Sequence, residues 1–353
     1  MTTDHPTTGD VVPLPDATAG AAARAGVSRV DGPLGRLGDA VAWAATVQGT
    51  ARPHPFRNVR VVVVAADHGV AALEVSAHPS SASAERARAA ATGDGVYARL
   101  AAAAGAGLRV EDVGLNTDVG LNTAVTGLGE PVRRGSGVLG VEDTLTAADV
   151  AAAFDRGRAI ADAEVDAGAD LVVPAVVGVG ASSPAAVLVA ALCDEEPAAM
   201  TGRGSGIGDE AWMRKCVAVR DGLRRARATG SDPMALLATA GGADLAAVAG
   251  FLLQAAVRRT PALLDGVTVL AAALIAREVA GTSTEWWFAP HDGGDRAEGA
   301  ALRVLGLTPL VDLGLRFGDG TGALAVLPLL QAALDLSAGS LSADYPEPPA
   351  GER

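Results

Sequence analysis

The sequence predicts an α/β fold in which a mostly parallel sheet carries helices on both faces, as in Rossmann-like domains. The first observation is that short, continuous apolar runs recur along the 353 residues, each ending in a turn rich in Gly or Asp. The second is that segments with apolar residues at helical spacing follow most of these runs. Strands that alternate with helices form parallel sheets, because each crossover helix packs back onto the sheet.

Five apolar runs are the expected strands of this sheet. The run at residues 60–66 (RVVVVAA) is typical of a strand buried on both faces, and it ends directly in Asp67 and His68. Open α/β sheets bind ligands at the carboxyl ends of their strands, so these two residues are candidates for ligand binding. An Asp turn with a capping His is the alternative interpretation. The other strands are expected at residues 108–113, 170–174, 261–264 and 285–289.

Helices are expected between and around these strands. Thr146 suits the N-cap of residues 147–167, and Ser183 followed by Pro184 suits the start of residues 185–192. The near-identical residues 112–117 and 118–123 indicate a local duplication that lengthens a loop. The remaining helices are expected at residues 34–48, 82–104 (with a break at 93–95), 209–228, 232–240, 243–257, 267–277, 296–305 and 324–334.

The strand-containing part, residues 59–305, is expected to form an α/β nucleotide-binding domain. Residues 21–58 and 306–336 have helical patterns without strands, and we expect them to pack together as a smaller helical domain. Residues 1–20 are predicted to be a flexible lead. The tail at residues 337–353, rich in Pro, Ser and acidic residues, is predicted to be mobile.

Composition excludes several classes of function. The net charge of −13 argues against nucleic acid or an anionic membrane as the main partner. No apolar run approaches the roughly 18 residues of a membrane span, and residues 1–15 lack the apolar core of a signal peptide. Cys193 and Cys216 have no metal-like spacing and are interpreted as buried thiols in a reducing compartment. We therefore expect a soluble cytoplasmic protein that acts on small molecules.

Two Gly-rich turns have the composition of anion-binding sites. Residues 178–183 (GVGASS) follow a predicted strand and precede a helix, an arrangement that offers free N–H groups and a helix dipole to an anion. Residues 201–209 (TGRGSGIGD) precede the helix that contains Lys215. A flexible loop is the simpler interpretation of each turn alone, but two such turns, each opening a helix, favour a phosphate site.

A third Gly-rich stretch surrounds a single carboxylate, Asp319, in residues 315–323 (LRFGDGTGA). Its glycines let the backbone bend tightly and approach a ligand closely. Because an apolar helix is predicted directly afterwards, Asp319 is either a helix cap or a general base. The local sequence leaves both interpretations open.

Taken together and in order, these stretches resemble the nicotinate-nucleotide–dimethylbenzimidazole phosphoribosyltransferases, which make the lower-ligand nucleotide of cobalamin. The resemblance covers about residues 20–335, nearly the whole chain. The segments that carry it are residues 32–37, 65–70, 75–76, 112–114, 133–137, 202–207, 212–215, 232–237, 241–245, 264–266 and 316–323.

The resemblance implies a transfer of phosphoribose from nicotinate mononucleotide to a benzimidazole-type base, without a metal or redox cofactor. It also implies a dimer, either a homodimer or a heterodimer with a homologue. Asp319 occupies the position of the family's general base. The implied phosphate and nucleotide site comprises Gly178, Ser182, Ser183, Gly204, Ser205, Gly206, Lys215, Gly241 and Gly242. The implied base-binding residues are Asp67, His68, Ser76, Glu85, His291 and Arg316.

Several positions depart from the family pattern. Asp319 is one methylene shorter than the family's Glu, and Val176 stands where the family carries an acidic residue. Further departures are Arg29, Glu85, residues 181–183 and Asp295. Two hypotheses follow: a working phosphoribosyltransferase, or a catalytically impaired paralogue that binds nucleotide or base, or pairs with an active homologue. A dinucleotide-binding oxidoreductase is not supported, because no Gly-x-Gly-x-x-Gly turn follows the first strand.

Overall fold

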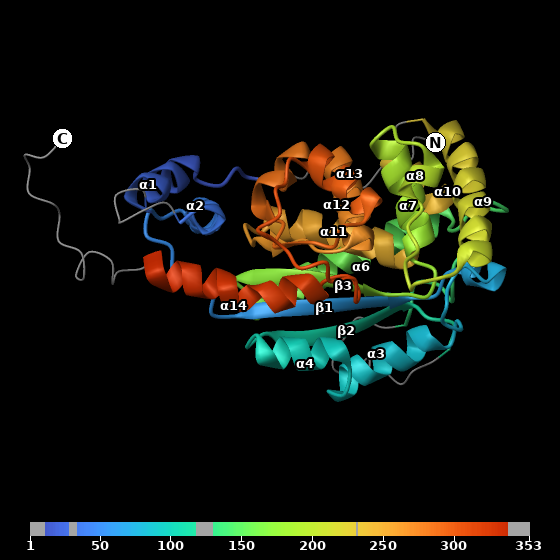
Figure 1. Cartoon of the computed structure of the whole chain (residues 1–353), viewed down its shortest axis with the longest axis horizontal. Coiled ribbons are helices and arrows are strands. Elements are labelled where there is room, and N and C mark those ends of the chain that lie inside the picture. The colour runs from blue at the N-terminus through green and yellow to red at the C-terminus, as the bar shows by residue number, and fades with distance from the viewer. Residues whose placement is uncertain (1–10, 28–33, 118–129, 231, 338–353) are drawn as a thin grey trace, which may run out of the picture.

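The computed structural model of the chain describes residues 11–27, 34–117, 130–230 and 232–337. Its centre is a five-stranded parallel sheet in the order β2-β1-β3-β4-β5, and β6 and β7 form a separate parallel pair. Figure 1 shows β2, β1 and β3 side by side. The strands are β1 (Val59–Ala66), β2 (Gly107–Gly114), β3 (Leu171–Val177), β4 (Ala262–Leu263), β5 (Trp287–Phe288), β6 (His291–Asp292) and β7 (Val311–Asp312). The predicted α/β class and all five predicted strands of the main sheet are confirmed.

Helices cover both faces of the sheet, as predicted. Figure 1 shows α3 (Ala82–Thr92) and α4 (Val96–Ala103) on one side of β1 and β2, and α11 (Ala243–Val257) on the other. The remaining helices are α1 (Ala17–Val27), α2 (Arg36–Gln48), α6 (Ala147–Asp166), α7 (Ser182–Leu192), α8 (Pro197–Met200), α9 (Asp209–Ala226), α10 (Pro233–Ala240), α12 (Val267–Val279), α13 (Arg296–Leu305) and α14 (Thr321–Asp335), with 3-10 turns η1 (Gly69–Leu73), η2 (Arg227–Thr229) and η3 (Gly281–Trp286).

The central strands are apolar along their whole length because helices pack on both of their faces. Val61, Val62 and Val63 of β1 are fully buried, and their partners Val173, Pro174 and Ala175 on β3 lie in register with them. Such strands have no exposed face that would favour alternating polar residues. The continuous valine run is therefore consistent with the interior position of β1, between β2 and β3.

Of the two predicted N-caps, Thr146 was correct and Ser183 was wrong. Thr146 forms a capping box with Asp149 at the start of α6, and Asp232, which was not predicted as a cap, caps α10. The N–H of Ser183 already donates to the carbonyl oxygen of Gly180 at 2.8 Å. Helix α7 therefore begins at Ser182, and its N-cap is Ala181, two residues before the predicted one.

The N-terminal end of the described chain is more ordered than the composition predicted. Helix α1 begins at Ala17, within the predicted flexible lead, because the Asp16 carboxylate accepts hydrogen bonds from the N–H groups of Thr18 and Ala19. Before it, Val12 is buried, and the indole N–H of Trp286 donates to the carbonyl oxygen of Pro13. The predicted lead at residues 1–10, Arg29, residues 32–33, the repeat at 118–123 and the tail at 338–353 lie outside the described residues.

The division into two domains stays a prediction. Helix α14 packs against α2, as expected for a small helical domain, but it also packs against α4 and β3. Cys193 and Cys216 are free thiols, and both are half-buried, so they are more accessible than we predicted. No helix in the described segments is long and apolar enough to cross a membrane.

Helices α6 and α11 pack backbone against backbone. A Cβ on Gly157 of α6 would lie 1.8 Å from the carbonyl oxygen of Ala247, and one on Gly250 would lie 2.0 Å from that of Phe154. Side chains at these positions would force the two helices apart.

We therefore expect Gly157→Ala to lower the free energy of unfolding by about 1–3 kcal/mol, because the added methyl group overpacks a backbone contact. Gly299→Ala in α13 is the matched control, since its Cβ would meet nothing closer than the flexible end of Arg303 at 3.9 Å. The control should stabilise the protein by about 0.4–1 kcal/mol. Urea unfolding measures both changes, and equal effects of the two substitutions would contradict the close packing of α6 on α11.

Candidate active site

Lys215 is a buried cation at the centre of the predicted phosphate site. It lies on α9, is 2% exposed, and its Nζ donates to Ser182 Oγ and to the carbonyl oxygen of Gly202, each at 2.9 Å. A Cβ on Gly204 would lie 3.4 Å from this Nζ, so the backbone of the second Gly-rich turn passes directly beside it. The structure thus brings both predicted turns together around one ammonium group.

The charge of Lys215 is incompletely compensated. Burial lowers the pKa of Lys215 from 10.5 to about 8, although the charge of Asp295 acts in the opposite direction. A phosphate beside this ammonium group would favour its charged form, since a neighbouring opposite charge offsets desolvation. The turn at Gly204–Gly206 has positive φ angles at both glycines, which keeps the backbone close without the strain that a side chain would add.

The second Gly-rich turn also meets the loop that contains Ser76. Ser205 Oγ accepts a hydrogen bond from the N–H of Ala77 at 2.9 Å and lies 3.2 Å from Ser76 Oγ. Ser76 was predicted to bind the base and Ser205 the phosphate, so the structure places the two predicted sites next to each other. The role of each hydroxyl stays a prediction.

His68 forms a buried pair with Asp244 where β1 ends. Its Nε2 lies 2.8 Å from Asp244 Oδ2, across 176 residues of sequence, and both side chains are at most 1% exposed. Burial lowers the pKa of His68, but the charge and hydrogen bond of Asp244 outweigh it, so the pKa is raised above 6.5. The ring lies between two predicted glycines, because a Cβ on Gly178 or Gly242 would come within 3.1 Å or 2.5 Å of its carbons.

Three buried polar atoms in this region have no hydrogen-bond partner within the described part of the chain: Asp67 Oδ1, His68 Nδ1 and Ser183 Oγ. The other oxygen of Asp67 accepts a hydrogen bond from the N–H of Asn116, at the end of β2. Buried polar groups are normally paired, so unpaired ones at the carboxyl edge of a sheet indicate a place for a polar ligand or water. All three residues were predicted as site residues.

Asp319 lies at the N-terminus of a helix, but not of the helix that follows it. Its Oδ1 accepts a hydrogen bond from the N–H of Thr268, in the first turn of α12, at 3.2 Å. Gly266 makes this contact possible, because a Cβ there would lie 2.0 Å from Asp319 Oδ1. No side-chain cap of α14 is formed at its N-cap, Gly320. Asp319 therefore does not cap its own helix, but its hydrogen bond from Thr268 is a capping contact at the start of α12. Its role as a general base stays a prediction.

The surroundings of Asp319 bring its titration close to neutral pH. Burial, together with the charges of Asp265 and Asp244, raises the pKa of Asp319 to about 7, against hydrogen bonds from Thr268. A carboxyl group with a pKa near the working pH is suited to accept a proton. The nearby phenol of Tyr97 is buried and donates to the carbonyl oxygen of Val176 at 3.2 Å. Burial and the charge of Asp319 raise the pKa of this phenol, so it stays neutral.

Asp265 joins the Asp319 loop to the end of β4. Its Oδ1 accepts a hydrogen bond from His291 Nδ1 at 3.0 Å, and its Oδ2 accepts one from the N–H of Gly322 at 2.8 Å. His291 Nε2 accepts the N–H of Leu315 at 3.3 Å, which assigns the ring proton to Nδ1. Both ring nitrogens of His291 are thus engaged within the protein, and its predicted base-binding role stays a prediction.

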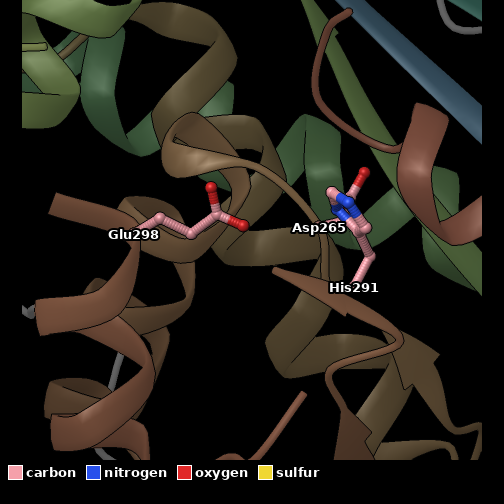
Figure 2. Close-up of side chains that lie close together, drawn as sticks. All are labelled: Asp265, His291 and Glu298. Carbon is pink, nitrogen blue, oxygen red and sulfur yellow. The ribbon is translucent and has the colours of Figure 1, made fainter. Parts of the chain in front are cut away.

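Figure 2 shows Glu298 extending from α13 towards Asp265 and His291. One donor atom from each of these three residues lies within 4.8 Å of the others, a spacing that could suit a metal ion. Both nitrogens of His291 already form hydrogen bonds, so a metal would have to displace one of them. Asp265 and His291 are therefore better described as a hydrogen-bonded pair, with Glu298 close by and bonded to the N–H of Gly293 instead. Sequence reasoning missed Asp265 and Glu298 as site residues, although the motif at residues 264–266 was noted.

Of the predicted base-binding residues, Arg316 is hydrogen-bonded to the protein backbone and Glu85 is exposed. The guanidinium group of Arg316 donates from Nε to the carbonyl oxygen of Gly293 at 2.6 Å and from Nη2 to that of Gly294 at 2.7 Å. Glu85 is exposed in the first turn of α3, whereas its neighbour Ser83 is buried and accepts the N–H of Val179 at 2.9 Å. Ser83, which the sequence analysis did not select, thus attaches α3 to the first Gly-rich turn.

Comparison with known proteins places this site in a family. A family model described as a phosphoribosyltransferase (DBI_PRT) matches residues 12–344. The chain belongs to this family. Among its relatives, the nicotinate-nucleotide–dimethylbenzimidazole phosphoribosyltransferases of Mycobacterium tuberculosis and Mycobacterium ulcerans are 49% and 48% identical to it over 326 residues, covering 92% of this chain and 90% of theirs.

Solved structures of the family have the same fold as this chain. A crystal structure of CobT from Thermus thermophilus matches with a TM-score of 0.82 and 33% identity, over 91% of this chain and 96% of that one. A structure titled nicotinate-nucleotide-dimethylbenzimidazole phosphoribosyltransferase from the same organism matches with a TM-score of 0.83 and 32% identity, over 93% and 98%. The resemblance identified from the motifs is therefore confirmed across nearly the full chain.

The buried pair of His68 and Asp244 gives a prediction about stability. We expect Asp244→Ala to lower the free energy of unfolding by about 3–5 kcal/mol at pH 6, because it leaves a buried imidazolium unpaired. The folded-state pKa of His68 is raised, so the pair's contribution is complete below the unfolded pKa and is lost as pH rises through the folded value. The effect should therefore shrink towards pH 9.

Urea unfolding at several pH values measures this effect. Asp39→Ala is the control, because Asp39 forms an exposed ion pair with Arg24 that is worth about 0–1 kcal/mol. A destabilisation by Asp244→Ala that does not change between pH 6 and pH 9 would show that His68 is not charged in the folded protein.

Proposed function

We propose that this protein transfers the 5-phosphoribosyl group of nicotinate mononucleotide to 5,6-dimethylbenzimidazole or a related base. The products are α-ribazole 5′-phosphate and nicotinate, for assembly of the nucleotide loop of cobalamin. The observation that carries the proposal is that Asp319, with a pKa of about 7, lies on the same edge of the sheet as the turns around Lys215. The relatives' names supply the substrates.

The chemistry follows from the proton balance of the reaction. A ring nitrogen of the base attacks C1 of the ribose while the bond from C1 to nicotinate breaks, and the electron pair of that bond returns to the pyridine nitrogen. The attacking azole must lose its N–H proton, and the carboxylate of Asp319 accepts it. Lys215 and the N–H groups of the two turns hold the 5′-phosphate, which keeps C1 in place during the attack.

The impaired-paralogue hypothesis depends mainly on two departures, at Val176 and Asp319. Val176 is buried near the end of β3, and its carbonyl oxygen accepts a hydrogen bond from the Tyr97 hydroxyl group. Its apolar side chain provides no second carboxylate near Asp319. Against this hypothesis, relatives almost half identical over nearly the whole chain carry the transferase name. We therefore favour the active enzyme.

We further infer that the enzyme works in the cytoplasm and as a homodimer, with a heterodimer as the alternative. Several large apolar side chains of the C-terminal segment are exposed, among them Leu313, Phe317 and Leu329 at 58%, 68% and 40%. Exposed apolar groups of this size are available for contact with a second subunit. Sedimentation of the purified protein tests this inference, and a monomer at micromolar concentration would contradict it.

We expect the purified protein to form α-ribazole 5′-phosphate and nicotinate from the two substrates, with kcat/KM decreasing below pH 7. Asp319 is active only when it is ionised, so each unit of pH below its pKa of about 7 removes about tenfold of the rate. Asp319→Asn should lower kcat by about 10²–10⁴-fold and abolish this acidic limb. Separation of the products by chromatography provides the rates.

Asp312→Asn is the control for this experiment, because Asp312 is exposed in β7 and close in sequence to the same loop. It should leave both kcat and the pH profile unchanged. If the unaltered chain forms no product and Asp319→Glu restores it, the chain has lost its catalytic competence. If neither forms product but calorimetry shows nucleotide binding, the protein is a binding paralogue.

Lys215→Met should raise KM for nicotinate mononucleotide by about 10–100-fold, because a charge-assisted hydrogen bond to phosphate is worth about 1.5–3 kcal/mol. Initial rates at varied nucleotide concentration measure this change. Arg220→Met on the exposed side of α9 is the matched control, since Arg220 pairs only with Asp221 among the described contacts. An unchanged KM in Lys215→Met would place the phosphate elsewhere.

A further inference from the structure

Glu298 is a buried carboxyl group that the proposed mechanism does not use. It lies in the first turn of α13, is 4% exposed, and extends towards Asp265 and His291 (Figure 2). We propose that Glu298 is a positioning residue for the transfer reaction: it fixes residues 291–294 and thereby holds the start of the Asp319 loop. This inference rests on the proposed function.

The contacts of Glu298 are with the backbone of Gly293. Its Oε1 accepts the N–H of Gly293 at 3.0 Å. Its other oxygen is so close to this residue that a Cβ on Gly293 would lie 2.7 Å from it. The carboxyl group therefore ties Gly293 to the first turn of α13, and only glycine leaves room for it to do so.

The segment that Glu298 fixes carries the attachment points of the Asp319 loop. The carbonyl oxygens of Gly293 and Gly294 accept both hydrogen bonds of the Arg316 side chain, at 2.6 Å and 2.7 Å. His291, two residues before Gly293, accepts the N–H of Leu315. Leu315 and Arg316 are four and three residues before Asp319, so this end of the loop depends on the position of residues 291–294.

The other end of the loop is held without Glu298. The N–H groups of Gly320 and Gly322 donate to the backbone oxygen and the Oδ2 of Asp265, at 3.0 Å and 2.8 Å. Loss of Glu298 should therefore loosen Leu315 and Arg316 while Gly322 stays fixed. Asp319 lies between these two ends, and a displacement of about 1 Å in a reacting group can cost about 10²-fold in rate.

The groups that face Glu298 are mostly acidic: Asp265 after β4, Asp292 on β6 and Asp319 on the loop, together with His291. Burial and the charges of these acids together raise the pKa of Glu298 to about 7, against the hydrogen bond from Gly293. The hydrogen bond from Gly293 needs only an acceptor oxygen, which both the ionised and the neutral carboxyl group provide. Glutamine at position 298 would provide one as well.

The experiment compares Glu298→Ala, Glu298→Gln and the control Glu278→Ala with the unaltered protein. Glu278 is exposed near the end of α12 and pairs with its neighbour Arg277. Kinetics with nicotinate mononucleotide and dimethylbenzimidazole give kcat and KM, and amide hydrogen exchange reports on each end of the loop. We expect Glu298→Ala to lower kcat about 10–100-fold, with KM for the nucleotide within about twofold of its original value.

Exchange at the Leu315 amide should become faster in Glu298→Ala, while exchange at Gly322 stays unchanged. Glu298→Gln should keep kcat within about threefold and the Leu315 exchange unaltered, because the acceptor is retained. Three results would overturn the inference: unchanged kcat and exchange in Glu298→Ala, faster exchange throughout the molecule including β1, or a Glu298→Gln variant as impaired as Glu298→Ala.

If the unaltered protein forms no product, the proposed function fails, and the exchange measurement still decides whether Glu298 positions the loop. Faster exchange at Leu315 in Glu298→Ala, with Gly322 and β1 unchanged, would support positioning without turnover. Equal exchange in all variants would reject it. Failure of the inference and failure of the proposed function are therefore distinguishable.

Discussion

The position of Asp319 depends on the hydrogen bonds that Asp265 accepts from the loop around it. Asp265 follows β4, one of the two-residue strands of this sheet. Its carboxylate accepts hydrogen bonds from His291 Nδ1 and from the N–H of Gly322, and its backbone oxygen accepts a hydrogen bond from the N–H of Gly320. A buried carboxylate is costly unless such donors satisfy it. Because Gly320 and Gly322 belong to the C-terminal loop, their hydrogen bonds to Asp265 attach that loop to the residues that follow β4, and His291 attaches β6 to the same carboxylate.

Burial shifts the two principal groups of the site in opposite directions. It raises the pKa of Asp319 to about 7 and lowers that of Lys215 to about 8, because desolvation disfavours whichever form is charged. The pKa values of both groups therefore lie near neutral pH, which suits the roles proposed for them: Asp319 as proton acceptor and Lys215 as phosphate partner. The charges of Asp265 and Asp244 contribute to the raised pKa of Asp319. The charge of Asp295 only partly offsets the lowering of the Lys215 pKa by burial.

The sequence allowed the strands, most helices and the Gly-rich turns to be predicted, because continuous apolar runs and clustered glycines are local signals. Lys215 and the two turns around it were predicted correctly as neighbours. The pair of His68 and Asp244 was not predicted, since 176 residues separate them and only the strand order brings them together. Glu298 and Asp265 were missed because each resembles an ordinary acidic residue, Glu298 at the start of a helix and Asp265 in a turn.

The shorter side chain at position 319 is the departure for which the structure offers a physical account. The Asp319 carboxylate reaches the N-terminus of α12 directly, because Gly266 has no side chain and a Cβ there would lie 2.7 Å from the Asp319 Cα. The loop backbone is thus drawn in against α12, and the N–H of Thr268 fixes the carboxylate. A longer side chain starting from the same backbone would have to leave this donor or displace the loop. The position of the Asp319 carboxylate, the proposed proton acceptor, is therefore set by the loop and its attachments to Asp265 and residues 291–294, and the side-chain length has to match them.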